Sequence, residues 1–338
     1  MEIQIIHYTP EWHDRLLAYM QSVYPHRNSE YLNWWITNLD NAGFAYWDKS
    51  PLILEDGHQI VGCTTVNPIS IVNQKNTESF FCWGNTIVSP NQRGKGISKG
   101  IYNERNLFKN WLAIGITDIG WKIQLKYVHT FTPLRPINVY IGVNRLIVIQ
   151  SLKRFFHISY SSVPDVSFPL KLKINGHDEI RRINNVAEME IPINGHWTVD
   201  DIEFVRDRDF IQKRFFDIYC AKRYGIYHYL SNGKSIGYVI LRKTRYKGFE
   251  MISLVDYRFH SRKDELLAFK VASKIARLNH IGLVIAFSSR DYGNRLVPLV
   301  IKTKKEVSCA TGYKDYTDRF KDVLITSGDS DLDFVYYM

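Results

Sequence analysis

The stretch of sequence that decides the fold is Trp83-Gly84-Asn85-Thr86-Ile87-Val88-Ser89-Pro90-Asn91-Gln92-Arg93-Gly94-Lys95-Gly96-Ile97-Ser98. Residues 79–88 favour a β-strand that ends before Pro90, and residues from Ile97 onward favour a helix. Between them, Gly94 and Gly96 allow backbone conformations that other residues rarely adopt. The stretch therefore predicts a strand, a glycine turn and a helix N-terminus in immediate succession.

Such a succession predicts an anion-binding site. Free backbone N–H groups of the turn and the positive end of the helix dipole converge on one point, which suits a pyrophosphate. Arg93 and Lys95 add positive charge, and the Ser98 hydroxyl can donate a hydrogen bond.

Two well-known phosphate motifs do not fit. A P-loop needs G-x-x-x-x-G-K-[ST], but Ser89 stands five positions before Gly94, and Gly96 follows Lys95. The dinucleotide fingerprint needs G-x-G-x-x-G, and Lys99 occupies its third glycine position. The turn must therefore belong to another type of phosphate site.

The pattern that does fit is V-x-P-x-x-R-G-x-G-[IVL]-[GS], matched by Val88, Pro90, Arg93, Gly94, Gly96 and Ile97. In this pattern the sequence resembles the acyl-CoA-binding motif of the GCN5-related N-acetyltransferase superfamily. Asn91 departs from that motif, because its shorter core, Q/R-x-x-G-x-G/A, begins with Gln or Arg. The resemblance extends over roughly residues 1–160.

The resemblance implies a position for each part of the cofactor. Its phosphates would lie on the turn, at Gln92, Arg93, Gly94, Lys95, Gly96, Ile97 and Ser98. The fourth strand would part from the fifth, and the pantetheine arm would pair with the backbone of Ile87 and Val88. The thioester carbonyl would lie near Asn85, where a backbone N–H can stabilise the developing oxyanion.

The catalytic residues are less clearly defined. Many members of the superfamily carry an acidic residue on the fourth strand, but Phe80–Thr86 contains none. His129, on a strand predicted over Tyr127–Phe131, is the candidate base that would take a proton from the amine. A later helix of the family often supplies a tyrosine that protonates the thiolate; Ser151 occupies that position here, which leaves nearby Tyr140 as the candidate acid.

The first block of the chain, 1–163, is predicted to be one domain. Its expected strands and helices are Met1–Thr9, Pro10–Tyr24, a helix capped by Ser29, Pro51–Glu55, Gln59–Val66, Ile69–Val72, Ser79–Val88, Ile97–Trp111, Tyr127–Phe131, Asn144–Phe155 and His157–Ser161. The Asp56-Gly57 pair predicts a hairpin turn. The fold class is therefore α/β (α+β), with a mixed, mostly antiparallel sheet flanked by helices.

A second block, 196–338, repeats the same order after an irregular connecting segment, 164–195. We expect elements at Asp209–Tyr219, Ile236–Lys243, Glu250–Tyr257, Lys263–Asn279, Leu283–Phe287 and Val323–Thr326, with a hairpin at Asn232-Gly233. The matching strand-to-helix turn, Asp256–Arg262, has no glycine and should not bind CoA. We therefore expect two tandem units, the second of which has lost the CoA-binding turn. Asp256 would lie at a strand end facing the cleft and is a candidate ligand for the acceptor.

Composition limits the compartment and the partners. The formal charge of +10 favours acidic partners such as phosphate-bearing cofactors or an anionic membrane surface. The four cysteines include no C-x-x-C pair, which favours buried thiols over a zinc site. The N-terminus does not resemble a signal peptide, and no run of apolar residues is long enough to span a membrane, so we expect a cytoplasmic protein.

These observations lead to an acyl-CoA-dependent N-acyltransferase, with acetyl-CoA as the default donor and no metal. The acceptor would be the amine of a small molecule such as an amino sugar or an amino acid, or of a peptide-like metabolite; nucleic acid is not expected. Two alternatives stay open: an aminoacyl-tRNA-dependent aminoacyltransferase of the peptidoglycan-bridge type, and a non-catalytic CoA-binding module.

Overall fold

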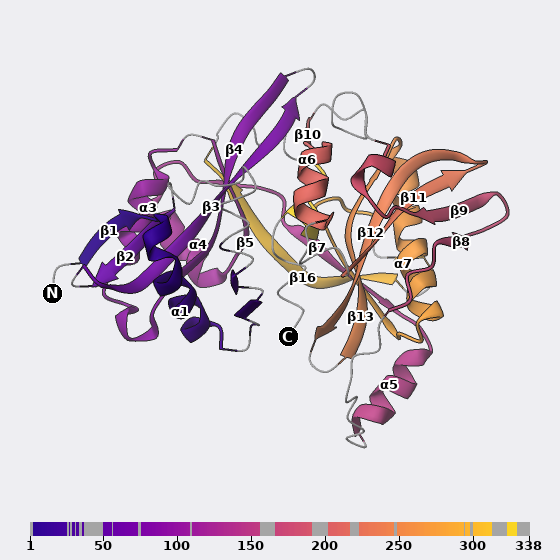
Figure 1. Ribbon diagram of the computed structural model, residues 1–338, viewed down its shortest axis with the longest axis horizontal. Helices are drawn as coiled ribbons and strands as arrows, with labels where there is room; N and C mark the ends of the chain where they lie inside the picture. The colour runs from indigo at the N-terminus through magenta and orange to yellow at the C-terminus, as the bar shows by residue number, and fades with distance from the viewer. Residues whose placement is uncertain are drawn as a thin grey trace. The chain divides into compact units, whose positions relative to one another are not determined.

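The computed structural model divides the chain into two compact units (Figure 1). Unit 1 comprises residues 1–135 and 307–321, and unit 2 comprises 136–306 and 322–338. The structure describes residues 3–25, 27, 29–30, 32–33, 36, 50–55, 57–73, 76–108, 110–155, 166–190, 202–216, 223–246, 249–293, 295–297, 300–312 and 323–329. Both units combine strands with flanking helices, so the predicted α/β class is confirmed.

Unit 1 has a sheet with the neighbour order β1-β2-β3-β4-β5. Its described elements are β1 (Ile3–His7), η1 (Pro10–Trp12), α1 (His13–Val23), β2 (Pro51–Glu55), β3 (Gln59–Asn73), β4 (Asn76–Val88), η3 (Pro90–Gln92), α3 (Ser98–Arg105), β5 (Trp111–Ile116), α4 (Asp118–Tyr127) and β6 (Thr132–Pro133). Strands β1 to β4 pair antiparallel, and β5 joins β4 in parallel.

Unit 2 has a sheet with the neighbour order β7-β14-β13-β12-β11-β9-β8. Its described elements are β7 (Ile137–Val143), α5 (Leu146–Phe155), β8 (Lys171–Lys173), β9 (Asp178–Arg182), η4 (Val186–Glu188), β10 (Ile202–Phe204), α6 (Arg208–Ile211), η5 (Gln212–Phe216), β11 (Tyr224–Ser231), β12 (Lys234–Tyr246), β13 (Phe249–Phe259), η6 (Arg262–Glu265), α7 (Leu266–Leu278), β14 (Leu283–Ser288), β15 (Arg295–Val297) and η8 (Ser327–Asp329).

The same order of elements occurs in each unit. Three antiparallel strands lead into a helix, and the next strand pairs in parallel with the strand before the helix: β2-β3-β4-α3-β5 in unit 1 and β11-β12-β13-α7-β14 in unit 2. A parallel pair needs a crossover connection, which the helix supplies in both cases. The strand-to-helix junctions after β4 and β13 are therefore comparable positions.

Strand β16 (Val300–Thr311) contributes to both units, because residues 300–306 belong to unit 2 and residues 307–311 to unit 1. In unit 1 it pairs antiparallel with β5, from Ser308 opposite Ile116 to Thr311 opposite Leu112. Strand β7 pairs with β14 in unit 2. The units thus have different bounds from the predicted domains 1–163 and 196–338.

Each unit has its own apolar core. The core of unit 1 includes Trp83, Ile101, Trp111 and Ala310, all at most 2% exposed. In unit 2 the inward face of α7, including Phe269 and Ile275, packs on the central strands. Spacing of apolar residues at helical intervals explains why Lys263–Asn279 was correctly predicted as helical.

Two predictions between the glycine turn and residue 131 are wrong. The helix predicted over Ile97–Trp111 ends at Arg105, and Trp111 begins the buried strand β5. Residues Tyr127–Phe131 do not form a strand: α4, capped by Thr117, ends at Tyr127 and a turn follows. Thr117 accepts a hydrogen bond from the Gly120 N–H, which provides a local start for this helix.

Other differences concern the second block. Part of the segment predicted as irregular, 164–195, forms the hairpin β8–β9. The strand predicted over Val323–Thr326 is absent, although these residues are buried. The strand His157–Ser161, most of the helix after Ser29 and Cys220 lie outside the described residues. Cys63, Cys82 and Cys309 are buried and form no disulfide within the described residues.

Candidate functional site

The glycine turn of unit 1 has the predicted local structure. Strand β4 ends at Val88, and the N–H of Ser89 donates to the Val61 carbonyl at 2.8 Å. After the short helix η3, Gly94 and Gly96 adopt φ values of +81° and +77°. L-residues rarely adopt these values, so glycine is needed at both positions. Helix α3 then begins at Ser98.

The turn presents unused hydrogen-bond donors. Among the described residues, no acceptor is bound by the backbone N–H of Gly94, Gly96, Ile97 or Ser98. A Cβ built on either glycine would meet no atom within 4 Å, so open space faces the turn. Unused donors beside open space at a helix N-terminus suit an anion such as a phosphate.

The side chains of the turn are fixed by one another. Gln92 is buried, and its amide accepts from the Lys95 ammonium at 2.9 Å and donates to the Glu55 carboxylate at 3.1 Å. The exposed Arg93 donates from Nε to the Val88 carbonyl at 3.1 Å. Lys95 and Arg93 therefore place two cationic side chains at an exposed turn anchored on strand β2.

Strands β4 and β5 part in the second half of β4, before this turn. Their parallel pairing is limited to Phe81 with Trp111 and Cys82 with Leu112. Beyond Cys82, β4 continues to Val88 without β5 as its partner, while β5 pairs on its other side with residues 308–311. The backbone of Ile87 and Val88 consequently lies on an edge of β4 that β5 does not cover.

A bulge interrupts β4 at Asn85. The β3–β4 register shifts here: Cys63 lies opposite Ile87 and Thr65 lies opposite Gly84. Asn85 adopts φ +49°, and the Thr64 hydroxyl lies 2.9 Å from the Gly84 carbonyl and 2.8 Å from the Thr86 hydroxyl. The bulge takes Asn85 and Thr86 out of the regular ladder and bends the strand where the resemblance puts the thioester.

His129 does not lie on a strand next to this edge. It is exposed in the turn after α4, where its backbone N–H donates to the Asn106 side chain at 2.9 Å. The expected strand position, which was the reason for considering His129 as the base, is therefore wrong.

Tyr140 lies on β7 in the core of unit 2. Its hydroxyl donates to the Arg290 carbonyl at 3.2 Å and accepts from the Tyr292 N–H at 3.0 Å. Burial raises the pKa of Tyr140 to about 12. Both hydrogen-bonding functions of the hydroxyl are thus used within the core, where the residue also packs edge-on against Phe269.

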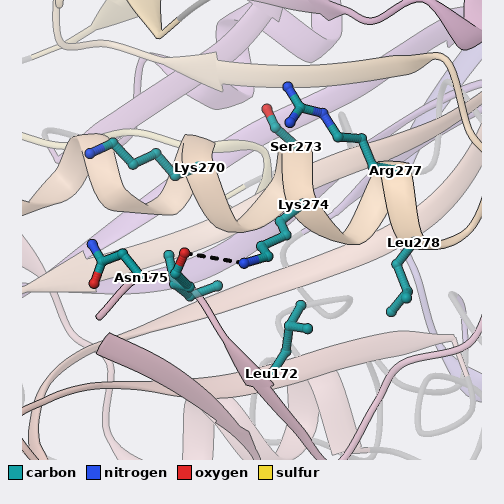
Figure 2. Close-up of a pocket in the computed structure, with 8 residues that line it drawn as sticks. Leu172, Asn175, Lys270, Ser273, Lys274, Arg277 and Leu278 are labelled. Carbon is teal, nitrogen blue, oxygen red and sulfur yellow. Dashed lines mark hydrogen bonds between the residues drawn. The ribbon is translucent and has the colours of Figure 1, made fainter. Parts of the chain in front are cut away.

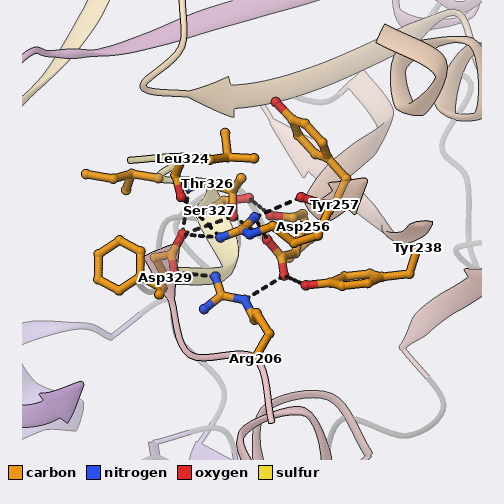
Figure 3. Close-up of polar contacts among 12 residues, drawn as sticks. Arg206, Tyr238, Asp256, Tyr257, Leu324, Thr326, Ser327 and Asp329 are labelled. Carbon is orange, nitrogen blue, oxygen red and sulfur yellow. Dashed lines mark hydrogen bonds and ion pairs between the residues drawn. The ribbon is translucent and has the colours of Figure 1, made fainter. Parts of the chain in front are cut away.

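Asp256 is not an exposed ligand at the end of a strand. Figure 3 shows it within a buried network of charges in unit 2. Its carboxylate accepts from Arg206 Nε at 3.0 Å and from Arg258 Nη1 at 2.7 Å. Burial acts to raise the pKa of Asp256, but the two guanidinium groups outweigh burial and hold it well below its usual range. Asp256 therefore stabilises unit 2 instead of facing a cleft.

Two neighbours of the turn were not predicted from the sequence. Glu55 holds Gln92, and Tyr19 of α1 donates to the Val61 carbonyl at 3.2 Å, the same carbonyl that accepts from Ser89. No local pattern marks either residue, because each meets the turn only through tertiary packing.

The sequence matches no protein-family model and none of the curated proteins. The fold, in contrast, is similar to solved structures. A GCN5-related N-acetyltransferase from Anabaena variabilis is 12% identical with a TM-score of 0.53, covering 91% of this chain and 72% of that chain. A Saccharomyces cerevisiae N-myristoyltransferase with bound myristoyl-CoA is 11% identical with a TM-score of 0.56, covering 91% and 78%. A probable N-acyltransferase from Enterococcus faecalis is 13% identical with a TM-score of 0.51, covering 93% and 73%.

The chain is thus a mixed α/β protein in which a strand, a glycine turn and a helix follow a bulged strand that parts from its neighbour. Its fold is similar to the folds of solved N-acetyltransferase and N-myristoyltransferase structures, as the resemblance of the sequence implied.

Proposed function

We propose that this protein is an acyl-CoA-dependent N-acyltransferase whose donor binds unit 1. The observation that carries the proposal is the turn Gln92–Gly96, with its unused N–H donors, two glycines of positive φ and two cationic side chains. The fold of the neighbouring solved structures supports the same assignment. The repeated order of elements supports two tandem units, and the second has no glycine in the junction Asp256–Arg262, where a donor would bind in the first.

The phosphates would be held by the N–H groups of Gly94, Gly96, Ile97 and Ser98, with Arg93 and Lys95 adding charge. The pantetheine arm would pair with the uncovered edge of β4 at Ile87 and Val88. In the structure the Arg93 side chain donates a hydrogen bond to the Val88 carbonyl oxygen. When acyl-CoA binds, this side chain would turn away from that oxygen and toward the phosphates.

The reaction would be direct attack of the acceptor amine on the thioester carbonyl. The new C–N bond forms, the C–S bond breaks, and the electron pair leaves with the sulfur, which takes up a proton. An N–H of the bulge at Asn85–Ile87 would stabilise the negative charge on the carbonyl oxygen. The amine must lose a proton to a base or to a water molecule.

The donor is proposed to be acetyl-CoA, and the acceptor to be the amine of an amino sugar, an amino acid or a peptide-like metabolite. Both an N-acetyltransferase and an N-myristoyltransferase have a similar fold, so the length of the transferred acyl chain must be tested by comparing acyl-CoA donors directly. Binding of acetyl-CoA and myristoyl-CoA by calorimetry, followed by mass-spectrometric detection of acyl transfer to a panel of amines, makes that comparison.

A second candidate is a non-catalytic CoA-binding module. Two observations favour it: residues Phe80–Val88 of β4 contain no carboxylate, and His129 lies in an exposed turn. Binding of CoA without transfer to any amine in the panel would favour the module over the enzyme. Absence of binding to every acyl-CoA would contradict both.

The location of the site can be tested with a matched pair of variants. Gly94 and Gly233 both have positive φ, +81° and +78°, and open space around the Cβ position. Gly94→Val and Gly233→Val should therefore cost a similar stability, about 1–2 kcal/mol. We expect only Gly94→Val to weaken CoA binding, by at least about tenfold. Equal affinities of the two variants would show that the donor binds elsewhere.

A further inference from the structure

Helix α5 of unit 2 carries an apolar stripe that faces solvent. Val148, Ile149, Leu152 and Phe155 are 59%, 50%, 53% and 76% exposed, respectively. The opposite side of the helix packs closely: a Cβ at Gly282 would lie 2.5 Å from the Ile147 nitrogen. An exposed apolar stripe is the feature by which amphipathic helices bind a membrane surface.

A cationic groove runs beside α7 in the same unit (Figure 2). It has a volume of about 650 Å³ and an apolar lining from Leu172, Ile174 and Leu278. Lys270, Lys274 and Arg277 supply its charges, and none of the described residues that line it is acidic. Lys274 is used internally, because it donates to the Lys173 and Ile174 carbonyls at 2.6 and 3.1 Å.

The other two cations are available for an external anion. Lys270 and Arg277 are exposed and form no ion pair within the described residues. They are two helical turns apart, about 10 Å along the axis. Two separated positive charges along an open groove suit a surface with many anionic groups better than a single small anion.

The stripe and the groove meet at the C-terminal end of α7. Asn144, which precedes α5, donates to the Ile281 carbonyl at 2.8 Å and lines a small pocket together with Arg277. The Asn279 side chain accepts from the Ser167 N–H and donates to the Ser167 carbonyl. These two hydrogen bonds hold the segment that leads to the exposed Leu170 beside the end of α7. The start of α5 and the cationic groove are therefore adjacent at this end of α7.

We propose that this basic-apolar face, formed by the stripe of α5 and the groove between α7 and β8, binds the surface of an anionic lipid bilayer. The apolar stripe would enter the boundary between head groups and acyl chains, while Lys270 and Arg277 contact lipid phosphates. A second copy of the chain suits the face less well. A two-fold contact would bring the same cations together, and their repulsion opposes association.

The experiment is co-sedimentation of the full chain with vesicles of phosphatidylcholine alone or with 30% phosphatidylserine. We expect binding to the anionic vesicles that weakens as salt rises. Leu152→Ser with Phe155→Ser should lower the partition coefficient at least about tenfold. Lys270→Gln with Arg277→Gln should lower it about fivefold per charge removed.

Matched changes on helix α4 of unit 1 serve as controls. Ile119→Ser with Leu125→Ser removes side chains that are similarly exposed, 73% and 59%, and Lys122→Gln with Lys126→Gln removes two exposed cations. These variants should bind vesicles like the parent protein. The proposal is overturned if the parent ignores anionic vesicles, if the α4 variants lose as much binding, or if Leu152→Ser with Phe155→Ser only abolishes self-association. Unchanged melting temperatures and CoA affinity show that the folds are intact.

Discussion

The side-chain amide of Gln92 donates to the Glu55 carboxylate at 3.1 Å and thereby joins the glycine turn to strand β2. The same amide accepts from Lys95, so one buried side chain fixes both the turn and one of its charges. The geometry of the proposed donor site thus depends on a residue 37 positions earlier in the chain.

Gln92→Ala should weaken CoA binding by about fivefold to tenfold. It removes two hydrogen bonds, each of net value about 1 kcal/mol, that hold Lys95 and the turn in place. Calorimetric titration with CoA measures the effect. Glu55→Gln retains a hydrogen-bonding partner and is expected to remain within about twofold of the parent. An unchanged affinity of Gln92→Ala would show that the turn is rigid without this contact.

Substitutions of Asn85 should show whether its backbone conformation or its side chain matters for the proposed site. Its φ of +49° is tolerated by Asn and Gly but costs a β-branched residue about 1–3 kcal/mol. We expect Asn85→Gly to keep CoA binding and any transfer activity, since the backbone of the bulge is retained. Asn85→Val should lose stability and activity.

Asn232 provides the matched control for this position, with φ +50° in a hairpin turn of unit 2. Asn232→Val should lose a similar amount of stability in urea unfolding but keep its affinity for CoA. If Asn85→Gly abolished transfer while binding persisted, the Asn85 side chain itself would take part in the reaction.

Asp256→Asn should destabilise unit 2 by about 3–5 kcal/mol, because it removes one carboxylate partner of both Arg206 and Arg258 and leaves the buried network one negative charge short. Asp329, which also pairs with Arg206, compensates only in part. Glu203→Gln is the comparison: burial raises the pKa of Glu203 despite Arg258, so neutralising it should cost less. Equal losses would show that the two carboxylates contribute alike.

The same network predicts that the stability of the protein falls at acidic pH. The pKa of Asp256 is lower in the folded than in the unfolded state, so its stabilisation is present above the ordinary aspartate pKa, about 3.9. It is lost as pH falls below that value toward the folded pKa. Melting temperature measured between pH 6 and pH 2.5 should fall more steeply for the parent than for Asp256→Asn. Parallel curves would contradict this assignment.

Arg105 offers a test of a buried cation without a described carboxylate partner. Burial lowers its pKa to about 10, and its guanidinium stacks 5.1 Å from the Trp83 ring centroid and 4.9 Å from that of Trp111. We expect Arg105→Lys to cost about 2–3 kcal/mol, because the charge stays buried while the planar stacking is lost.

Arg105→Met removes the charge but keeps most of the apolar packing, and it should cost less than Arg105→Lys. Urea unfolding of both variants at pH 7 gives the order. A greater loss in Arg105→Met would show that the cation–π contacts outweigh the desolvation of the guanidinium.

Local patterns were enough to predict several elements correctly. The helix periodicity of Lys263–Asn279, the Asn232-Gly233 turn and the glycine turn after Val88 each specify their structure within a few residues. The turn proposed to bind an anion could be located for the same reason, since all its donors come from one short stretch of the chain.

Longer-range features could not be predicted in this way. The apolar run Trp111–Ile116 is compatible with helix or strand, and only its pairing with β4 and β16 decides between them. Asp256 sits at the position expected for a ligand, but Arg206 is supplied from 50 residues earlier. Charge pairing between distant residues leaves no periodic signal in the sequence.

Strand β16 has a consequence for how the protein is made. Residues 308–311 pair with β5 in unit 1, so the first 135 residues leave the ribosome with that strand edge still unpaired. Translation must continue through most of unit 2 before the edge can be closed, and an open edge invites pairing with other chains. Premature termination before residue 308 would therefore yield an aggregation-prone fragment, even though the whole glycine turn has already been synthesised.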